Sequence, residues 1–255
     1  MGVLQGRVAI VTGGGAGLGL AIAQELAAEG CDIAIAERDA PAGERAAAGL
    51  RALGVQARSY EVDVSVAAEV DAAFTSVPRD LGRLDIVVNN AGVSHVGPTI
   101  AETTDEAWAE SVGVMQSGVF YCLRAAARQL LPQGSGSVVN ISSIRGFSPN
   151  PGRVAYCASK AAVLMMTRVA AGEWAGSGVR VNAIAPGIQR TPMWDADVER
   201  GAIDEQFYLH TVPMGRIGDP REVGRLAVYL CSDDAAYVTG GCFTIDGGLT
   251  SIAAG

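Results

Sequence analysis

The chain contains a single lysine, Lys160, and it follows a tyrosine by four residues in the stretch YCASK (156–160). Every other residue in the total of 19 Lys plus Arg is an arginine. Residues four apart on a helix lie one above the other on one face, so we expect the Lys160 ammonium beside the Tyr156 phenol. Ser143 adds a hydroxyl at the end of a predicted strand.

These three side chains predict proton transfer to or from an alcohol. A tyrosine phenol has a pKa near 10, which is too high for a good base at neutral pH. A neighbouring ammonium favours the phenolate, so we expect the pKa of Tyr156 to be lowered. The phenolate would remove the alcohol proton while the Ser143 hydroxyl holds the substrate oxygen. Lysine suits this slot because its ammonium is compact, whereas the planar fork of arginine is wide.

A glycine-rich stretch, VTGGGAGLG (11–19), follows the first predicted strand and opens the first predicted helix. Gly13, Gly17 and Gly19 permit a tight turn, let the backbone approach a pyrophosphate and aim the helix N-terminus at it. The spacing TGxxxGxG differs from the commoner GxGxxG. The stretch predicts a dinucleotide site, and the positive charge of an oxidised nicotinamide would lower the pKa of Tyr156 further.

The residue at the end of the second predicted strand, Glu37, bears on which dinucleotide binds. A carboxylate there accepts hydrogen bonds from the ribose hydroxyls and repels a 2′-phosphate, which favours NAD. Arg38 beside it could favour the phosphate instead. Asp63, after the third strand, could accept a hydrogen bond from the adenine amino group. The stretch NNAG, with Asn90, Ala91 and Gly92, ends the fourth strand and permits close packing under a ribose.

Short β-branched runs alternate with alanine-rich helical patterns along the chain. The predicted strands cover residues 7–12, 32–36, 57–62, 84–89, 137–142, 179–184 and 242–245, and the predicted helices cover 18–29, 42–53, 66–77, 105–131, 155–175 and 220–231. Continuously apolar strands separated by helices predict a doubly wound parallel α/β sheet of about seven strands, covered by helices on both faces. We expect one domain over 1–255, with a substrate loop at about 190–219 where the alternation breaks.

Composition excludes several classes of site and partner. The formal net charge of −8 disfavours nucleic acid as a partner. Five irregularly spaced cysteines and two histidines suggest neither a disulfide framework nor a metal site. We see no signal peptide and no membrane-spanning run, so we expect a cytoplasmic protein with no membrane partner.

Taken together, the motifs resemble those of a single-domain short-chain dehydrogenase/reductase over essentially the whole chain. The resemblance rests on TGGGAGLG, the acid at 37, VDV around Asp63, NNAG, NISS, YCASK, PGIQRTPM (186–193) and TGGCFTIDGG (239–248). It implies a Rossmann-type fold and a homotetramer with subunit contacts on the helices near 105–131 and 155–175. It also implies a catalytic triad of Ser143, Tyr156 and Lys160, and an NAD site made of Gly13, Gly17, Leu18, Gly19, Glu37, Asp63, Val64, Asn90, Ala91, Gly92, Tyr156, Lys160, Pro186, Gly187, Ile188 and Thr191.

One position departs from the family pattern. Where the family usually has a catalytic asparagine, GVMQSGVF (113–120) carries Met115, whose side chain is no substitute for an amide. A backbone carbonyl at 115 could still hold the water of a proton relay. Met115 is the one feature that favours a non-catalytic, dinucleotide-binding family member over an NAD-dependent oxidoreductase of a secondary alcohol or its ketone.

A second alternative is a 3-oxoacyl-carrier-protein reductase using NADPH. Such an enzyme must dock an acidic carrier, and both Glu37 and the net charge of −8 count against it.

The sequence leaves the small-molecule substrate open. Candidates for lining its pocket are His95, Arg145, Phe147, Arg153, Met193, Trp194, Phe207, Tyr208 and His210. Arg145 and Arg153 bracket the reacting groups and could bind a carboxylate bidentately. The alternative is that both arginines face solvent or pair with Asp195, Asp197 or Glu199.

Overall fold

Seven parallel strands form one sheet in the order β3-β2-β1-β4-β5-β6-β7. The computed structural model describes residues 2–94, 97–201 and 203–251, although the side chain of Met193 is outside this description. The strands are β1 Val8–Thr12, β2 Asp32–Glu37, β3 Ala57–Glu61, β4 Ile86–Asn89, β5 Gly136–Ile141, β6 Val179–Pro186 and β7 Cys242–Ile245. The predicted doubly wound sheet is therefore confirmed, with all seven strands in the predicted places.

The order of the strands across the sheet changes direction at β1. β1 pairs with β2 on one side, where Thr12 lies opposite Ala36, and with β4 on the other, where Val11 lies opposite Val88. The two halves of the chain diverge from this point, which leaves a crevice beyond the carboxyl ends of the strands. The residues that follow β1, β2 and β4 therefore meet at one end of the sheet.

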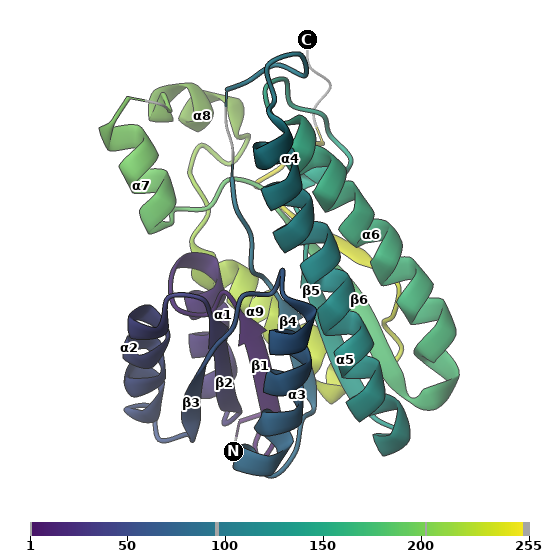
Figure 1. The fold of residues 1–255 in the computed structure, drawn as a ribbon. Helices are drawn as coiled ribbons and strands as arrows, with labels where there is room; N and C mark the ends of the chain where they lie inside the picture. The colour runs from purple at the N-terminus through teal and green to yellow at the C-terminus, as the bar shows by residue number, and fades with distance from the viewer. Residues whose placement is uncertain (1, 95–96, 202, 252–255) are drawn as a thin grey trace.

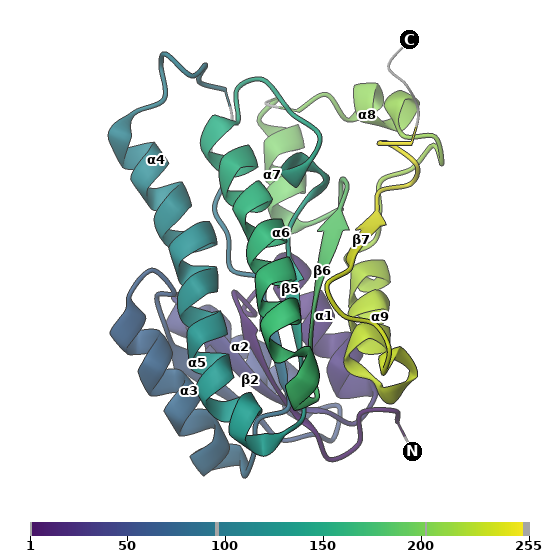
Figure 2. The ribbon, with the colours of Figure 1, turned by 90° about the vertical axis from the view of Figure 1, so that its right-hand side faces the viewer.

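Helices cover both faces of the sheet. The predicted helices are observed as α1 Gly17–Ala28, α2 Ala40–Arg51, α3 Ala67–Leu81, α4 Asp105–Val112, α5 Gly118–Gln133, α6 Val154–Trp174 and α9 Pro220–Cys231. The core on one face packs side chains of α3, α5 and α6, and the core on the other packs those of α1, α2 and α9. Figure 2 shows the sheet between these two layers. Successive residues of β1 supply both cores, because Val8 and Ile10 face one way and Ala9 and Val11 the other.

Two predictions about local structure were wrong. The continuous helix expected over 105–131 is interrupted by a π-helical turn, Gly113–Ser117, between α4 and α5. The expected loop at 190–219 contains two short helices, α7 Pro192–Glu199 and α8 Glu205–Thr211. Their apolar periodicity is weak, but the Thr191 hydroxyl accepts from the Trp194 N–H and the Asp204 carboxylate from the Gln206 N–H, so each start is capped. Figure 1 shows α7 and α8 standing beyond the carboxyl ends of the strands.

One described helical segment, Val154–Ser177, is long and apolar enough to cross a membrane by length and composition. It includes α6, whose buried residues Val163, Ala170 and Ala171 belong to the core beneath the sheet. It also carries Lys160 in its second turn. These contacts are those of a core helix of an α/β domain.

Candidate active site

A cavity of about 570 Å³ lies at the carboxyl ends of the strands. It is lined by every described residue among the predicted triad and cofactor set: Gly13, Gly17, Leu18, Gly19, Glu37, Asp63, Val64, Asn90, Ala91, Gly92, Ser143, Tyr156, Lys160, Pro186, Gly187, Ile188 and Thr191. Residues up to 178 positions apart in the chain therefore share one site. The fold achieves this because parallel strands all end at the same edge.

The glycine loop at this edge is shaped for close approach. Gly13 and Gly17 have positive φ angles of 62° and 54°, in the left-handed region that favours glycine. A Cβ on Gly19 would lie 2.2 Å from the Gly13 carbonyl oxygen, so no side chain fits there. The residue that precedes α1, Ala16, provides no side-chain cap, which leaves the first-turn N–H groups available to an anion.

Two residues hold the glycine loop against β4. The Asn90 side-chain amide donates to the carbonyl oxygens of Thr12 and Gly13 over 3.0 and 3.1 Å. The Thr12 hydroxyl in turn accepts from the N–H groups of Asn90 and Ala91 over 3.0 and 3.1 Å. Sequence reasoning missed Thr12, although a hydroxyl at the end of an otherwise apolar strand was a usable signal. These bonds fix the spacing between the two strand ends that a ribose would bridge.

The Glu37 carboxylate is fixed at the end of β2. Its Oε2 accepts from the Gly15 N–H and its Oε1 from the Asp39 N–H, both over 3.1 Å. These two bonds place the carboxylate beside the glycine loop, in the cavity that Arg38 also lines. An acid in this position could accept hydrogen bonds from a ligand that lies along the loop.

Asp63 sits after β3 as a charged group. Its Oδ1 accepts from the Ser65 hydroxyl over 2.6 Å and from the Ser65 N–H over 2.9 Å. The Ser65 hydroxyl bond lowers the pKa of Asp63 from its ordinary value of 3.8, and burial opposes it. The carboxylate is therefore ionised at neutral pH and able to accept a further hydrogen bond.

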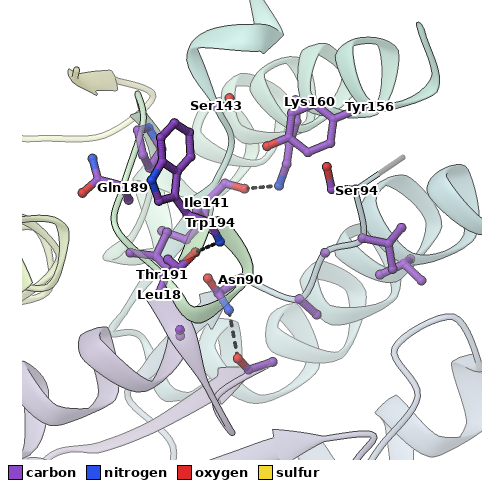
Figure 3. A pocket seen from close by; sticks show the side chains of 18 of the residues that line it. Leu18, Asn90, Ser94, Ile141, Ser143, Tyr156, Lys160, Gln189, Thr191 and Trp194 are labelled. Atoms are coloured by element: carbon purple, nitrogen blue, oxygen red, sulfur yellow. Dashed lines mark hydrogen bonds between the residues drawn. The ribbon is translucent and has the colours of Figure 1, made fainter. Parts of the chain in front are cut away.

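Lys160 projects from α6 into the cavity and is only 5% exposed. Its Nζ donates to the Ile141 carbonyl oxygen over 2.9 Å and lies 5.7 Å from the centroid of the Tyr156 ring. The Ser142 hydroxyl donates to the Lys160 carbonyl oxygen over 2.8 Å and joins α6 to the end of β5. Burial lowers the pKa of Lys160 to about 8, so the side chain is largely an ammonium at neutral pH. Figure 3 shows Lys160 and Tyr156 side by side on their helix.

The expectation of a lowered pKa at Tyr156 is wrong for the protein alone. Burial raises the pKa of this phenol above its ordinary value of 10.0. A hydrogen bond with Ser143 and the charges of Arg153 and Arg145 lower the pKa, but they do not outweigh burial. The sequence revealed the neighbouring ammonium and could not reveal how deeply the phenol is buried.

Ser143 begins a short 3-10 helix, Ile144–Gly146, directly after β5. Its hydroxyl oxygen accepts from the Arg145 N–H over 3.1 Å, and its hydroxyl group also bonds with the Tyr156 phenol. Ser143 and Tyr156 are thus positioned to hold one oxygen atom between two hydroxyl groups.

Met115 lies in the π-helical turn and is 1% exposed. Its sulfur packs beside the NNAG stretch, where a Cβ on Gly92 would meet it at 3.6 Å. The neighbouring Val114, and not Met115, lines the cavity. A π turn displaces carbonyl groups from the regular α-helical ladder, and such turns often occur at functional sites. The backbone at 115 therefore lies in an irregular turn and not in a regular α-helix.

The predicted substrate residues separate into three groups. Arg145, Arg153, Trp194 and Tyr208 line the cavity, and the Trp194 and Tyr208 rings meet edge to face with centroids 5.3 Å apart. Phe147 and Phe207 are 50% and 59% exposed, and they and His210 do not line it. His95 and the side chain of Met193 lie outside the described residues.

Several cavity residues were not predicted. Asn150, Gln189 and Ser94 line the cavity, as Figure 3 shows for Gln189 and Ser94. The Gln189 side-chain oxygen and the Trp194 Nε1 are buried and have no hydrogen-bond partner among the described residues. Unpaired buried polar atoms in a cavity wall are consistent with a polar ligand, and their partners could not be read from the sequence.

Comparison with known proteins gives one consistent result. Residues 13–250 match the profile of a protein family described as "Enoyl-(Acyl carrier protein) reductase". The 2-(S)-hydroxypropyl-CoM dehydrogenase 3 of Xanthobacter autotrophicus is 38% identical over 98% of each chain. The NADP-dependent (R)-specific alcohol dehydrogenase of Lentilactobacillus kefiri is 39% identical over 97% of this chain and 98% of the relative.

A solved structure of an NAD⁺-bound xylitol dehydrogenase superposes with a TM-score of 0.92, at 35% identity over 96% of this chain and 99% of that one. The chain belongs to the short-chain dehydrogenase/reductase family.

Proposed function

We propose that the protein is an NAD-dependent oxidoreductase that transfers a hydride between a small secondary alcohol, or its ketone, and the nicotinamide. The observation that carries the proposal is the assembly of Ser143, Tyr156 and Lys160 in the same cavity as the glycine loop and Glu37. The dehydrogenase relatives support alcohol oxidoreduction as the reaction class.

The residues present fit a dinucleotide. The uncapped start of α1 offers N–H groups to a pyrophosphate, and the glycine loop has no side chains that would fill its place. Glu37 would accept from the adenosine ribose, and Lys160 would donate to the ribose on the nicotinamide side. The whole set predicted from the sequence, from Gly13 to Thr191, lines the cavity that would hold it.

The reaction requires the chain to hold one oxygen and move one proton. When bound, the nicotinamide supplies the hydride acceptor or donor. Ser143 donates a hydrogen bond to the substrate oxygen, and Tyr156 accepts the hydroxyl proton during oxidation or returns it during reduction. Because burial raises the pKa of Tyr156, the positive charge around it sets how readily the phenolate forms. Lys160, Arg153 and Arg145 contribute that charge from the protein.

Glu37 favours NAD over NADP. A 2′-phosphate would compete for the space of a carboxylate that is already fixed by two N–H groups. The relatives themselves differ, since one is NADP-dependent and one solved structure is NAD⁺-bound. The choice therefore depends on this chain's own residues, and the same carboxylate disfavours the NADPH-dependent carrier-protein reductase.

We infer that the single domain acts as a homotetramer in the cytoplasm. Large apolar side chains are exposed on the helices that the family resemblance assigns to subunit contacts: Trp108 on α4, Phe120 on α5, and Met165 and Val169 on α6. Burying such side chains against a second copy would be favourable.

The direct test is steady-state NADH production from a panel of secondary alcohols with NAD⁺ and NADP⁺. We expect turnover with NAD⁺ and its loss in Tyr156→Phe. Cofactor binding without turnover of any alcohol or ketone would instead favour the non-catalytic alternative. Light scattering of the same preparation measures the number of subunits.

A further inference from the structure

Two guanidinium groups line the reacting end of the cavity. Arg145 follows Ser143 in the short 3-10 helix, and Arg153 is the residue that precedes α6, three positions before Tyr156. The Arg153 Cζ lies 6.0 Å from the centroid of the Tyr156 ring. Both charges act on the phenol, since each lowers its pKa. Both arginines line the same cavity as Ser143 and the Tyr156 phenol.

Neither arginine pairs with a carboxylate in the described part of the chain. Two of the acids considered for such pairing, Asp195 and Asp197, form ion pairs with other arginines. Asp195 and Glu205 both pair with Arg190, and Asp197 pairs with Arg200 over 2.6 Å. The alternative in which Asp195 or Asp197 neutralises the two arginines is therefore wrong.

The polar contacts of the two guanidiniums are few and long. The Arg153 Nη1 donates to the Ser94 hydroxyl over 3.3 Å, and the Arg145 Nη1 donates to the Pro149 carbonyl oxygen over 3.4 Å. Each guanidinium carries five N–H donors, so most donors of both groups remain available. Two partly buried cations that have no counter-ion among the described residues are costly unless a ligand supplies the anion.

We propose that Arg145 and Arg153 bind an oxyanion on the substrate, so that the natural substrate is a secondary alcohol, or its ketone, with a carboxylate or sulfonate a few atoms from the carbinol. The inference rests on the proposed function, because it places the anion relative to the atom that Tyr156 deprotonates. The two guanidiniums would fix which carbon faces the nicotinamide and would select charged over neutral alcohols of the same size.

The cofactor's own phosphates are a poor explanation for these arginines. The pyrophosphate is expected at the uncapped start of α1 and the glycine loop. Figure 3 shows Ser143 and Tyr156 at one end of the cavity, with Leu18 and Asn90 of the cofactor end at the other. A positive group near the adenosine end is already supplied by Arg38.

The test uses matched acids and amides on the full-length protein. The probes are 3-hydroxybutanoate, 4-hydroxypentanoate and 5-hydroxyhexanoate, the sulfonate analogue of each, and the neutral amide of each acid. We expect one of the anions to have a KM at least tenfold below that of its amide. Arg145→Ala and Arg153→Ala should each raise the KM for that anion by roughly ten- to a hundredfold, as for a lost charge-assisted pair, and change the KM for the amide by less than about threefold.

Controls separate recognition from other effects. Arg45→Ala removes an exposed guanidinium on α2, outside the cavity, and should leave both KM values unchanged. The NAD⁺ dissociation constant of each variant, from calorimetry, should match the wild type, because the arginines are assigned to substrate. Any change in the pKa of Tyr156 acts on acid and amide alike, so the ratio of their KM values isolates charge recognition.

The outcomes distinguish this inference from the proposed function. If amides and anions are turned over with equal KM, or if the arginine variants affect both equally, the anion site is wrong and the oxidoreductase stands. If no probe is turned over, calorimetry of the hydroxy acids and sulfonates with the NAD⁺-loaded protein tests whether the anion site exists. Anion binding lost in Arg145→Ala and Arg153→Ala would support the site without the reaction, and no arginine-dependent binding would overturn it.

Discussion

The Lys160 ammonium donates a hydrogen bond of 2.9 Å to the carbonyl oxygen of Ile141, the last residue of β5. This bond crosses from the second turn of α6 to the strand end that also presents Ser143. It explains why a compact ammonium on a slim stem occupies the position. The buried charge should cost stability and contribute to activity, and the two effects can be measured separately.

Lys160→Met should make the fold more stable at pH 7 while removing activity. The lowering of the Lys160 pKa from 10.5 to about 8 corresponds to about 3 kcal/mol against the charged form. The lost bond to Ile141 offsets about 1–2 kcal/mol of this. We expect a net gain of about 1–2 kcal/mol in the free energy of unfolding, measured in urea without cofactor.

The sign of the pH dependence follows from the same shift. Below about pH 8 the lysine is charged in the folded and unfolded states, so the full penalty of burial is present. As the pH rises from about 8 towards 10.5, the folded state loses its proton first and the wild type gains stability relative to the variant. A Lys160→Met variant that is less stable than the wild type at pH 7 would contradict this account.

Lys160→Arg keeps the positive charge but should lose activity severely. The guanidinium is wider than the ammonium and brings five donors to a buried slot whose protein acceptor is one carbonyl oxygen. The measurement is kcat with NAD⁺, with far-ultraviolet circular dichroism to verify folding. Near wild-type kcat in the arginine variant would show that charge alone is needed.

Tyr156→Phe should abolish turnover and preserve NADH binding, because only the hydroxyl that moves the proton is removed. In the wild type, burial raises the pKa of Tyr156, so alcohol oxidation should accelerate as the pH rises and the phenolate forms. Arg153→Ala should shift this profile to higher pH, since Arg153 lowers the pKa. A pH-independent oxidation rate between about pH 6 and 10 would remove Tyr156 from the role of base.

Glu37 should make kcat/KM for NAD exceed that for NADP by at least tenfold, about 1.4 kcal/mol. Glu37→Ala should bring the two kcat/KM values closer together, chiefly by raising kcat/KM for NADP, because the repulsion of the 2′-phosphate disappears. Glu44→Ala, an exposed acid on α2 paired with Arg51, is the matched control and should leave the ratio unchanged. Equal efficiencies in the wild type would refute the assignment of NAD.

Met115→Asn tests whether the backbone of the π turn serves where the family usually has an asparagine. If the carbonyl is sufficient, kcat should change by less than about tenfold with a similar pH profile. The variant should lose about 1–3 kcal/mol of stability, because an amide replaces a thioether that is 1% exposed. A much larger gain in kcat would show that the relay of the wild type is impaired.

The sequence determined the parts of this protein that depend on local pattern. The seven strands follow from short, mostly apolar runs such as Val8–Thr12. Every residue of this strand is buried, so each must be apolar or hydrogen-bonded. The positions of Gly13 and Gly17 follow from a turn that needs positive φ angles. Tyr156 and Lys160 share a face because they are one helical turn apart. Each of these features involves residues that are close in the chain.

Only the tertiary structure decided the burial, the pKa shifts and the ion pairs of those residues. Burial of Tyr156 raises its pKa, although the Ser143 hydrogen bond and the charges of Arg153 and Arg145 lower it. Hydrophobic periodicity does not reveal the π turn at Met115 or the two capped helices in the 190–219 segment. Among the described residues, Arg145 and Arg153 pair with no carboxylate, whereas Asp195 and Asp197 pair with Arg190 and Arg200. Burial and ion pairing depend on groups brought together from distant parts of the chain. Which acid pairs with which arginine, and how deeply a side chain is buried, are therefore fixed only in the folded structure.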